Sequence, residues 1–112
     1  MQIIIKATGI EMTQAINDYV NSKISGLEKY LQRVDNGAVE ARVEVGRSTN
    51  HHNKGNIFKA EVNLKVPGNL LRAEESNSDL YSAIDLVYDE IKRQVVSFKD
   101  KKIDQVVRQS RK

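Results

Sequence analysis

The chain has 112 residues, 39% of them hydrophobic, a formal net charge of +3 and no cysteine. This content is typical of one compact domain with a modest core, and the lack of cysteine excludes a disulfide framework and a thiolate metal site. The apolar run after Met1 is too short for a signal peptide, and no segment approaches the roughly 20 apolar residues of a membrane span. We therefore expect a soluble cytoplasmic protein without a membrane partner.

The charge is unevenly divided along the chain. Residues 1–91 contain ten Lys or Arg and thirteen Asp or Glu, whereas residues 92–112 contain eight and two. A basic cluster at one end of an otherwise acidic domain favours a polyanionic partner. Nucleic acid fits better than a membrane surface, because residues 92–112 lack interfacial Trp and Tyr.

The first predicted elements are a strand and a helix. Ile3, Ile4 and Ile5 indicate a short strand that is buried on both faces. Thr13 is a good N-cap for a helix, whose apolar stripe consists of Ile16, Val20, Ile24, Leu27 and Leu31. One flank of this stripe carries Tyr19, Lys23, Gly26, Tyr30 and Arg33. The simplest interpretation is that the tyrosines complete the core while the cations extend to solvent.

The period then changes from helical to alternating. After a turn at residues 35–37, one strand has the inward residues Val39, Ala41, Val43 and Val45. Residues 46–56 are polar and predict a mobile hairpin loop. The next strand has the inward residues Phe58, Ala60, Val62, Leu64 and Val66. A Pro67-Gly68-Asn69 turn leads to a short strand over residues 70–74.

A second helix is predicted over residues 78–102, with Ser78 as its N-cap. Its core-facing stripe consists of Leu80, Ile84, Val87, Ile91, Val95 and Phe98. One flank of that stripe carries Tyr81, Tyr88, Lys92 and Lys99. We expect residues 103–112 to be a flexible basic tail, either a frayed helical extension or a disordered segment. This tail is separate from the domain of residues 1–102.

This order predicts an α+β fold of the type β-α-β-β-β-α. The first crossover requires parallel strands and the later hairpins antiparallel ones, so the sheet is a mixed four-stranded sheet with two helices packed on one face. If the two flanks of tyrosine and positive charge face each other, they form a basic trough suited to RNA phosphates and base stacking. Periodicity does not fix whether they do.

The sequence contains no recognisable catalytic constellation. His51 and His52 are adjacent in the polar loop, where their side chains diverge, and the glycines form no phosphate-binding motif. We therefore expect no enzyme activity, catalytic residue, metal, cofactor or small-molecule substrate. An alternative to RNA binding is a protein-interaction module whose basic helix docks an acidic partner.

Three segments resemble a known family. They are GIEMTQAINDYVNSKISGLEKYL, AEVNLKVPGNLLRAEESNSDLYSAID and YDEIKRQ, and the similarity extends over about residues 1–102. They are similar to the ribosome hibernation promoting factors, the sigma-54 modulation protein family that includes the bacterial ribosome-associated inhibitor. The family fold, β-α-β-β-β-α, is the one that the periodicity predicts.

The resemblance implies a translation inhibitor that binds rRNA in the decoding-centre channel of the small ribosomal subunit during stress or stationary phase. The positions that match the rRNA-facing surface are Lys23, Lys29 and Arg93, continued by Lys99, Lys101 and Lys102. With the two flanks included, the expected site adds Arg33, Tyr81, Tyr88 and Lys92. Gly26, Glu90 and Ser97 stand where relatives often have lysine, and Lys92 where they often have an acidic or small residue.

The length of the chain suggests a short form of this family. Long forms add a C-terminal domain that joins two ribosomes, for which a chain ending at Lys112 has no room. The inhibitor type has an acidic tail, whereas residues 103–112 contain Arg108, Arg111 and Lys112 against Asp104. We therefore expect the hibernation-promoting type, monomeric when off the ribosome.

Overall fold

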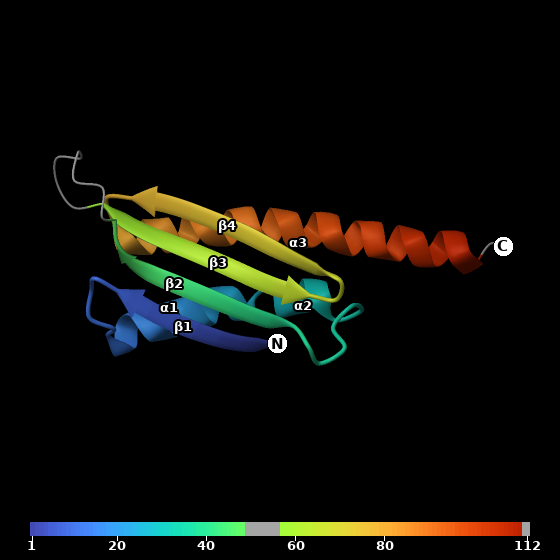
Figure 1. Ribbon diagram of the computed structural model, residues 1–112, viewed down its shortest axis with the longest axis horizontal. Coiled ribbons are helices and arrows are strands. Elements are labelled where there is room, and N and C mark those ends of the chain that lie inside the picture. Colours follow the sequence, from blue (N-terminus) through green and yellow to red (C-terminus); the bar gives the residue numbers. More distant parts are fainter. Residues whose placement is uncertain (49–56, 111–112) are drawn as a thin grey trace.

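The computed structural model describes residues 1–48 and 57–110, and the side chains as far as residue 102. Its elements are β1 (Gln2–Thr8), α1 (Gln14–Ser25), α2 (Glu28–Leu31), β2 (Glu40–Arg47), β3 (Phe58–Val66), β4 (Asn69–Asn77) and α3 (Leu80–Ser110). The four strands lie in the order β1-β2-β3-β4, with β1 and β2 parallel and the other pairs antiparallel. The helices cover one face of this sheet (Figure 1). The predicted fold class is therefore confirmed.

The core lies between the sheet and the helices, where the predicted apolar positions converge. On β2 and β3 the alternation places Val43, Val62 and Leu64 inward, each at most 2% exposed. The helical stripes meet them, and Ile24, Leu27, Ile84 and Ile91 are at most 1% exposed. Because both apolar stripes are buried in the core, only the flanks and outer faces of the helices remain accessible to a binding partner.

β1 departs from its predicted environment. Ile3 and Ile5 pack against the core, but Ile4 is 40% exposed on the opposite face of the sheet. β1 is an edge strand and the helices cover only one face, so burial on both faces was a wrong prediction. The continuous apolar run is typical of a doubly covered strand, which this sheet does not contain.

The first helix is divided into two segments. Gly26 and Leu27 form a turn between α1 and α2, although Leu27 and Leu31 remain buried and continue the stripe. A Cβ added at Gly26 would lie 3.2 Å from the hydroxyl oxygen of Tyr88. Glycine at this position therefore allows α3 to approach the turn closely.

The ends of α3 also differ from the prediction. Asp79, not Ser78, is the cap: its Oδ2 accepts hydrogen bonds of 2.9 Å from both the amide and the hydroxyl of Ser82. A charged acceptor is favoured at the positive end of the helix dipole. At its other end α3 continues to Ser110, well past the sheet, and gives the molecule its 59 Å length (Figure 1). The flexibility of residues 103–112 stays a prediction.

The two hairpins can also be compared with their predicted bounds. β4 runs from Asn69 to Asn77 and is longer than the predicted strand over residues 70–74. The Pro67-Gly68 turn before it has the expected positive φ, 74° at Gly68. Of the predicted loop over residues 46–56, residues 49–56 lie outside the described part of the chain, and His51 and His52 with them.

Candidate nucleic-acid interface

The two flanks of tyrosine and positive charge face each other. The rings of Tyr19 on α1 and Tyr81 on α3 meet edge to face, with their centroids 4.9 Å apart. Farther along, the Lys92 ammonium of α3 lies 5.6 Å from the centroid of the Tyr30 ring on α2. We call this line of contacts the interhelical seam; its side chains are Tyr19, Lys23, Tyr30, Tyr81, Asp85, Tyr88 and Lys92.

The end of the seam near Tyr19 is balanced in charge. The Tyr19 hydroxyl donates a short hydrogen bond to Oδ1 of Asp85, and the same oxygen lies 3.2 Å from the Lys23 ammonium. That ammonium also lies 6.0 Å from the centroid of the Tyr19 ring and 5.4 Å from that of Tyr88. The hydrogen bond to Asp85 is the main reason that the pKa of Tyr19 is raised to about 12.

The opposite end of the seam is strongly positive. Four cations gather around Tyr30, and we call them the basic cluster: Lys29, Arg33, Lys92 and Lys99. The Lys29 ammonium is 5.2 Å from the centroid of the Tyr30 ring. Lys29, Arg33 and Lys99 line a pocket of about 150 Å³ together with Tyr30 and Gln32.

In the described part of the chain no carboxylate forms an ion pair with the basic cluster, and Asp89 acts on Lys92 only at longer range. Within residues 1–48 and 57–102, none of its four cations has an Asp or Glu oxygen within 4 Å. Hydrogen bonding to Lys92, and more weakly to Lys29, lowers the pKa of Tyr30. The same hydrogen bond with Tyr30 raises the pKa of Lys92. The unpaired positive charge of the cluster therefore favours an anion.

Three predicted basic residues lie away from this cluster. Arg93 is on the outer side of α3, with its side chain 72% exposed and paired with Glu90 at 2.6 Å. Lys101 and Arg93 line a separate pocket of about 210 Å³ between α3 and β4. The Lys102 ammonium is 5.7 Å from the centroid of the Phe98 ring, beside the β3–β4 turn. Arg93 also lines a second hollow, of about 360 Å³, with Lys92 of the basic cluster and Asp89. Lys101 and Lys102 share no pocket with the cluster among the described residues.

The tyrosines mainly build the seam. Tyr19, Tyr30 and Tyr88 are partly buried against the core, whereas Tyr81 is 37% exposed. The interpretation that the tyrosines of the first helix complete the core therefore holds for Tyr19 and Tyr30, and Tyr88 has the same environment. Only the Tyr81 ring remains a candidate for stacking on an RNA base, because ammonium groups lie against the other three rings.

Sequence reasoning missed Asp85 as a member of the site. The residues Tyr81, Asp85, Tyr88 and Lys92 are separated by four, three and four positions, so the spacing alone places the carboxylate on the same flank. Attention to that spacing would have indicated that part of the trough is not basic.

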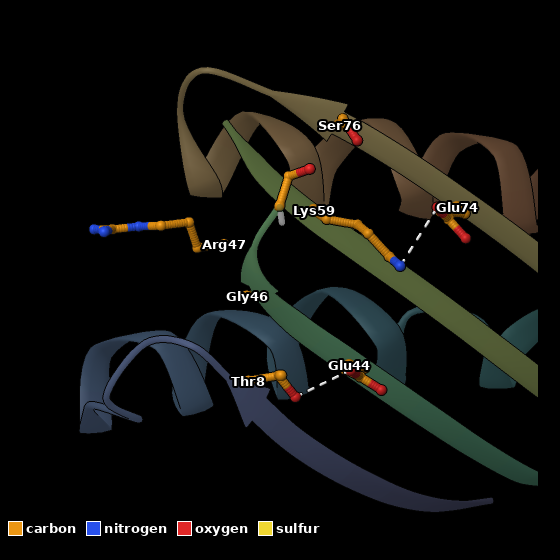
Figure 2. A pocket seen from close by; sticks show the side chains of 8 residues that line it. Thr8, Glu44, Gly46, Arg47, Lys59, Glu74 and Ser76 are labelled. Atoms are coloured by element: carbon orange, nitrogen blue, oxygen red, sulfur yellow. Dashed lines mark hydrogen bonds and ion pairs between the residues drawn. The ribbon is translucent and has the colours of Figure 1, made fainter. Parts of the chain in front are cut away.

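The open face of the sheet offers a contrasting pocket (Figure 2). This pocket, of about 380 Å³, lies at the end of the strands where Thr8 of β1 and Ser76 of β4 are found. The Thr8 hydroxyl donates to Glu44 at 3.0 Å, and the Lys59 ammonium lies 3.5 Å from Glu74. Its two cations, Arg47 and Lys59, are balanced by Glu44 and Glu74, so this pocket has no excess of positive charge for a polyanion.

The described part of the chain contains neither a cluster of metal-ligand side chains nor a membrane-spanning helix. Among residues 1–48 and 57–102, no three His, Cys, Asp or Glu side chains are placed to hold a metal ion. In those same ranges no helix is long and apolar enough to cross a membrane.

Similar proteins were found by sequence and by structure. Residues 3–103 match the family model described as Sigma 54 modulation protein / S30EA ribosomal protein. The ribosome hibernation promoting factor of Azotobacter vinelandii is 34% identical over 104 residues, which cover 93% of this chain and 88% of that protein. The ribosome hibernation promotion factor of Deinococcus radiodurans is 34% identical over 96 residues, 86% of this chain but 48% of that protein.

The structural comparison agrees with these matches. The crystal structure of the N-terminal domain of Thermus thermophilus Protein Y has a TM-score of 0.72 and 33% identity, covering 88% of this chain and 99% of that one. A ribosomal subunit interface protein from Coxiella burnetii, with a TM-score of 0.64 and 18% identity, shares the fold. The chain spans about half the length of several curated relatives. It belongs to the Sigma 54 modulation protein / S30EA ribosomal protein family.

Proposed function

We propose that this protein binds rRNA of the small ribosomal subunit, occupies the decoding-centre channel and promotes ribosome hibernation by inhibiting translation. The relatives named as hibernation factors support the ribosome as partner. The position in the channel rests on the resemblance of the residues. We propose in addition that the protein acts in the cytoplasm, without catalysis, and is a monomer when off the ribosome.

The basic cluster is the single observation that carries this proposal. Four cations from α2, its C-terminal turn and α3 converge on one place, where no carboxylate of the described residues lies within 4 Å of them. Lys and Arg in such a group contact phosphates, and phosphate contacts position a protein on RNA independently of base sequence. Recognition would then depend on RNA shape and backbone.

The remaining predicted residues are proposed as marginal contacts. Arg93, Lys101 and Lys102 extend the positive charge along α3, and Tyr81 is exposed enough to meet a base or ribose. Lys23 and Tyr88 lie at the balanced end of the interhelical seam. We expect these residues to contribute less to RNA binding than the basic cluster does.

Co-sedimentation with purified small ribosomal subunits tests the proposal. If about six phosphates are neutralised, affinity falls on the order of a thousandfold between 50 and 200 mM salt. Failure to sediment with subunits at 50 mM salt would contradict ribosome binding. Retention of an acidic protein in that case would support the alternative, a protein-interaction module.

A further inference from the structure

Asp85 is an unexpected residue on a surface proposed to bind RNA. It is 45% exposed at the side chain and lies in the interhelical seam, on the same flank of α3 as Tyr81, Tyr88 and Lys92. A carboxylate at this position repels phosphate. Asp85 therefore has a role other than contact with RNA.

The contacts of Asp85 define that role. One oxygen, Oδ1, accepts the hydrogen bond of the Tyr19 hydroxyl and lies 3.2 Å from the Lys23 ammonium. The carboxylate thus holds two side chains of α1 against α3. It also cancels the charge of Lys23, which is held near the rings of Tyr19 and Tyr88 at 6.0 and 5.4 Å.

The seam consequently has two electrostatically different ends. Near Tyr19 one carboxylate and one ammonium balance each other, whereas around Tyr30 four cations have no carboxylate within 4 Å in the described residues. A polyanion that lies along the seam therefore gains favourable electrostatic interaction only at the end around Tyr30. Phosphate placed at the first end must approach Asp85 or displace it from Lys23.

We propose that Asp85 is a specificity-determining residue that confines polyanion binding to the basic cluster, by neutralising Lys23 and repelling phosphate from the Tyr19 end of the interhelical seam. This inference rests on the proposed function, because it concerns how that same surface selects its ligand. It predicts that removing the charge of Asp85 enlarges the RNA-binding surface by one cation.

The salt dependence of binding to small ribosomal subunits measures that number of cations. Each additional phosphate contact steepens the slope of log affinity against log salt concentration by about 0.7 to 0.9. Asp85→Asn should steepen the slope by this amount, and Asp85→Asn combined with Lys23→Met should return it to the wild-type value. An unchanged slope in D85N, or a steeper slope that persists in the double variant, would overturn the proposal.

The control must change the net charge equally. Asp18→Asn on α1 does so, since Asp18 accepts a hydrogen bond from Gln14 at 2.7 Å and takes no part in the seam. D18N should bind with the wild-type slope, and a slope as steep as that of D85N would attribute the effect to net charge alone.

Lys23→Met in the wild-type background tests the role of Lys23 by the same salt dependence, and this test does not require D85N to fold. It should lower the slope by less than half as much as Lys92→Met, and an equal loss would contradict the inference.

A second probe separates this inference from the proposed function. On immobilised heparin, D85N should elute at a higher salt concentration than D18N, because Lys23 becomes available to sulfate groups. Equal elution would refute the role of Asp85 even if the wild type binds ribosomes. Failure of the wild type to bind subunits, with D85N still eluting later from heparin, would refute ribosome binding and leave the role of Asp85 supported.

Discussion

The hydrogen bond between Tyr19 and Asp85 joins two elements through a titratable donor. The phenol must keep its proton to donate to the carboxylate, and this requirement raises the pKa of Tyr19 to about 12. Ionisation of Tyr19 would place two negative charges side by side and separate α1 from α3. The seam is therefore sensitive to alkaline pH at one identifiable residue.

Comparison with Tyr19→Phe tests this link between ionisation and stability. A folded pKa above the ordinary value of 10 means that the stabilisation is complete below pH 10 and is lost as pH rises through about 12. Up to pH 10 the wild type should exceed Y19F by about 1.5 kcal/mol in free energy of unfolding, the contribution of a hydrogen bond to a charged group. Urea unfolding of both proteins between pH 8 and 12 gives the difference, and a difference that does not decline above pH 10 would contradict this account.

At the scale of elements, the pairing of β1 with β2 depends on a glycine. Gly46 is opposite Thr8 in the parallel register, and a Cβ at Gly46 would overlap the carbonyl oxygen of Thr8. The main chain of β1 occupies the space that a side chain would need. Any other residue at position 46 must therefore displace the edge strand.

Gly46→Ala should lower the free energy of unfolding by about 3 kcal/mol, as expected for severe overpacking. Gly37→Ala is the matched control: Gly37 has φ of 89° but nothing within 4 Å of its added Cβ. Backbone strain alone should cost about 1 to 2 kcal/mol at that position. Chemical denaturation measures both variants, and a G46A cost no larger than that of G37A would show that β1 moves easily.

The stripe and the outer face of α3 provide a second test at this scale. Ile91 is fully buried, and Ile91→Ala should cost about 2 to 5 kcal/mol. Leu86 on the same helix is 42% exposed, and Leu86→Ala should change stability by less than about 0.5 kcal/mol. Thermal or urea unfolding distinguishes them, and similar losses would contradict the assignment of the core face.

The helices and strands show which structural features the sequence pattern predicts and which it does not. Periodicity located the buried residues of both helices, such as Ile24 and Ile91, because burial on one side imposes that period. It misjudged Ile4, since a run of isoleucines does not reveal that its strand is at an edge. It missed the break at Gly26 and the pairing of Asp85 with Tyr19, because both depend on how closely α3 approaches α1.

At the scale of the whole molecule, charge is sorted between two faces. The open face of the sheet pairs cations with carboxylates, as Lys59 does with Glu74 and Arg72 with Glu61. The helical face gathers, at one end of its seam, four cations that have no carboxylate within 4 Å among the described residues. The composition predicted a basic C-terminal segment, but the positions of Lys29 and Arg33 beside Lys99 follow from the packing of α2 on α3. The basic cluster is therefore a product of tertiary structure.

The most direct test of the central claim compares two charge-matched double variants for binding to small ribosomal subunits. Lys92→Gln with Lys99→Gln removes two charges from the basic cluster, whereas Lys6→Gln with Lys65→Gln removes two exposed charges from the open face of the sheet. The first pair should make the salt dependence of affinity shallower by about 1.4 to 1.8, and the second should leave it close to the wild-type value. Equal changes in the two double variants would contradict the account.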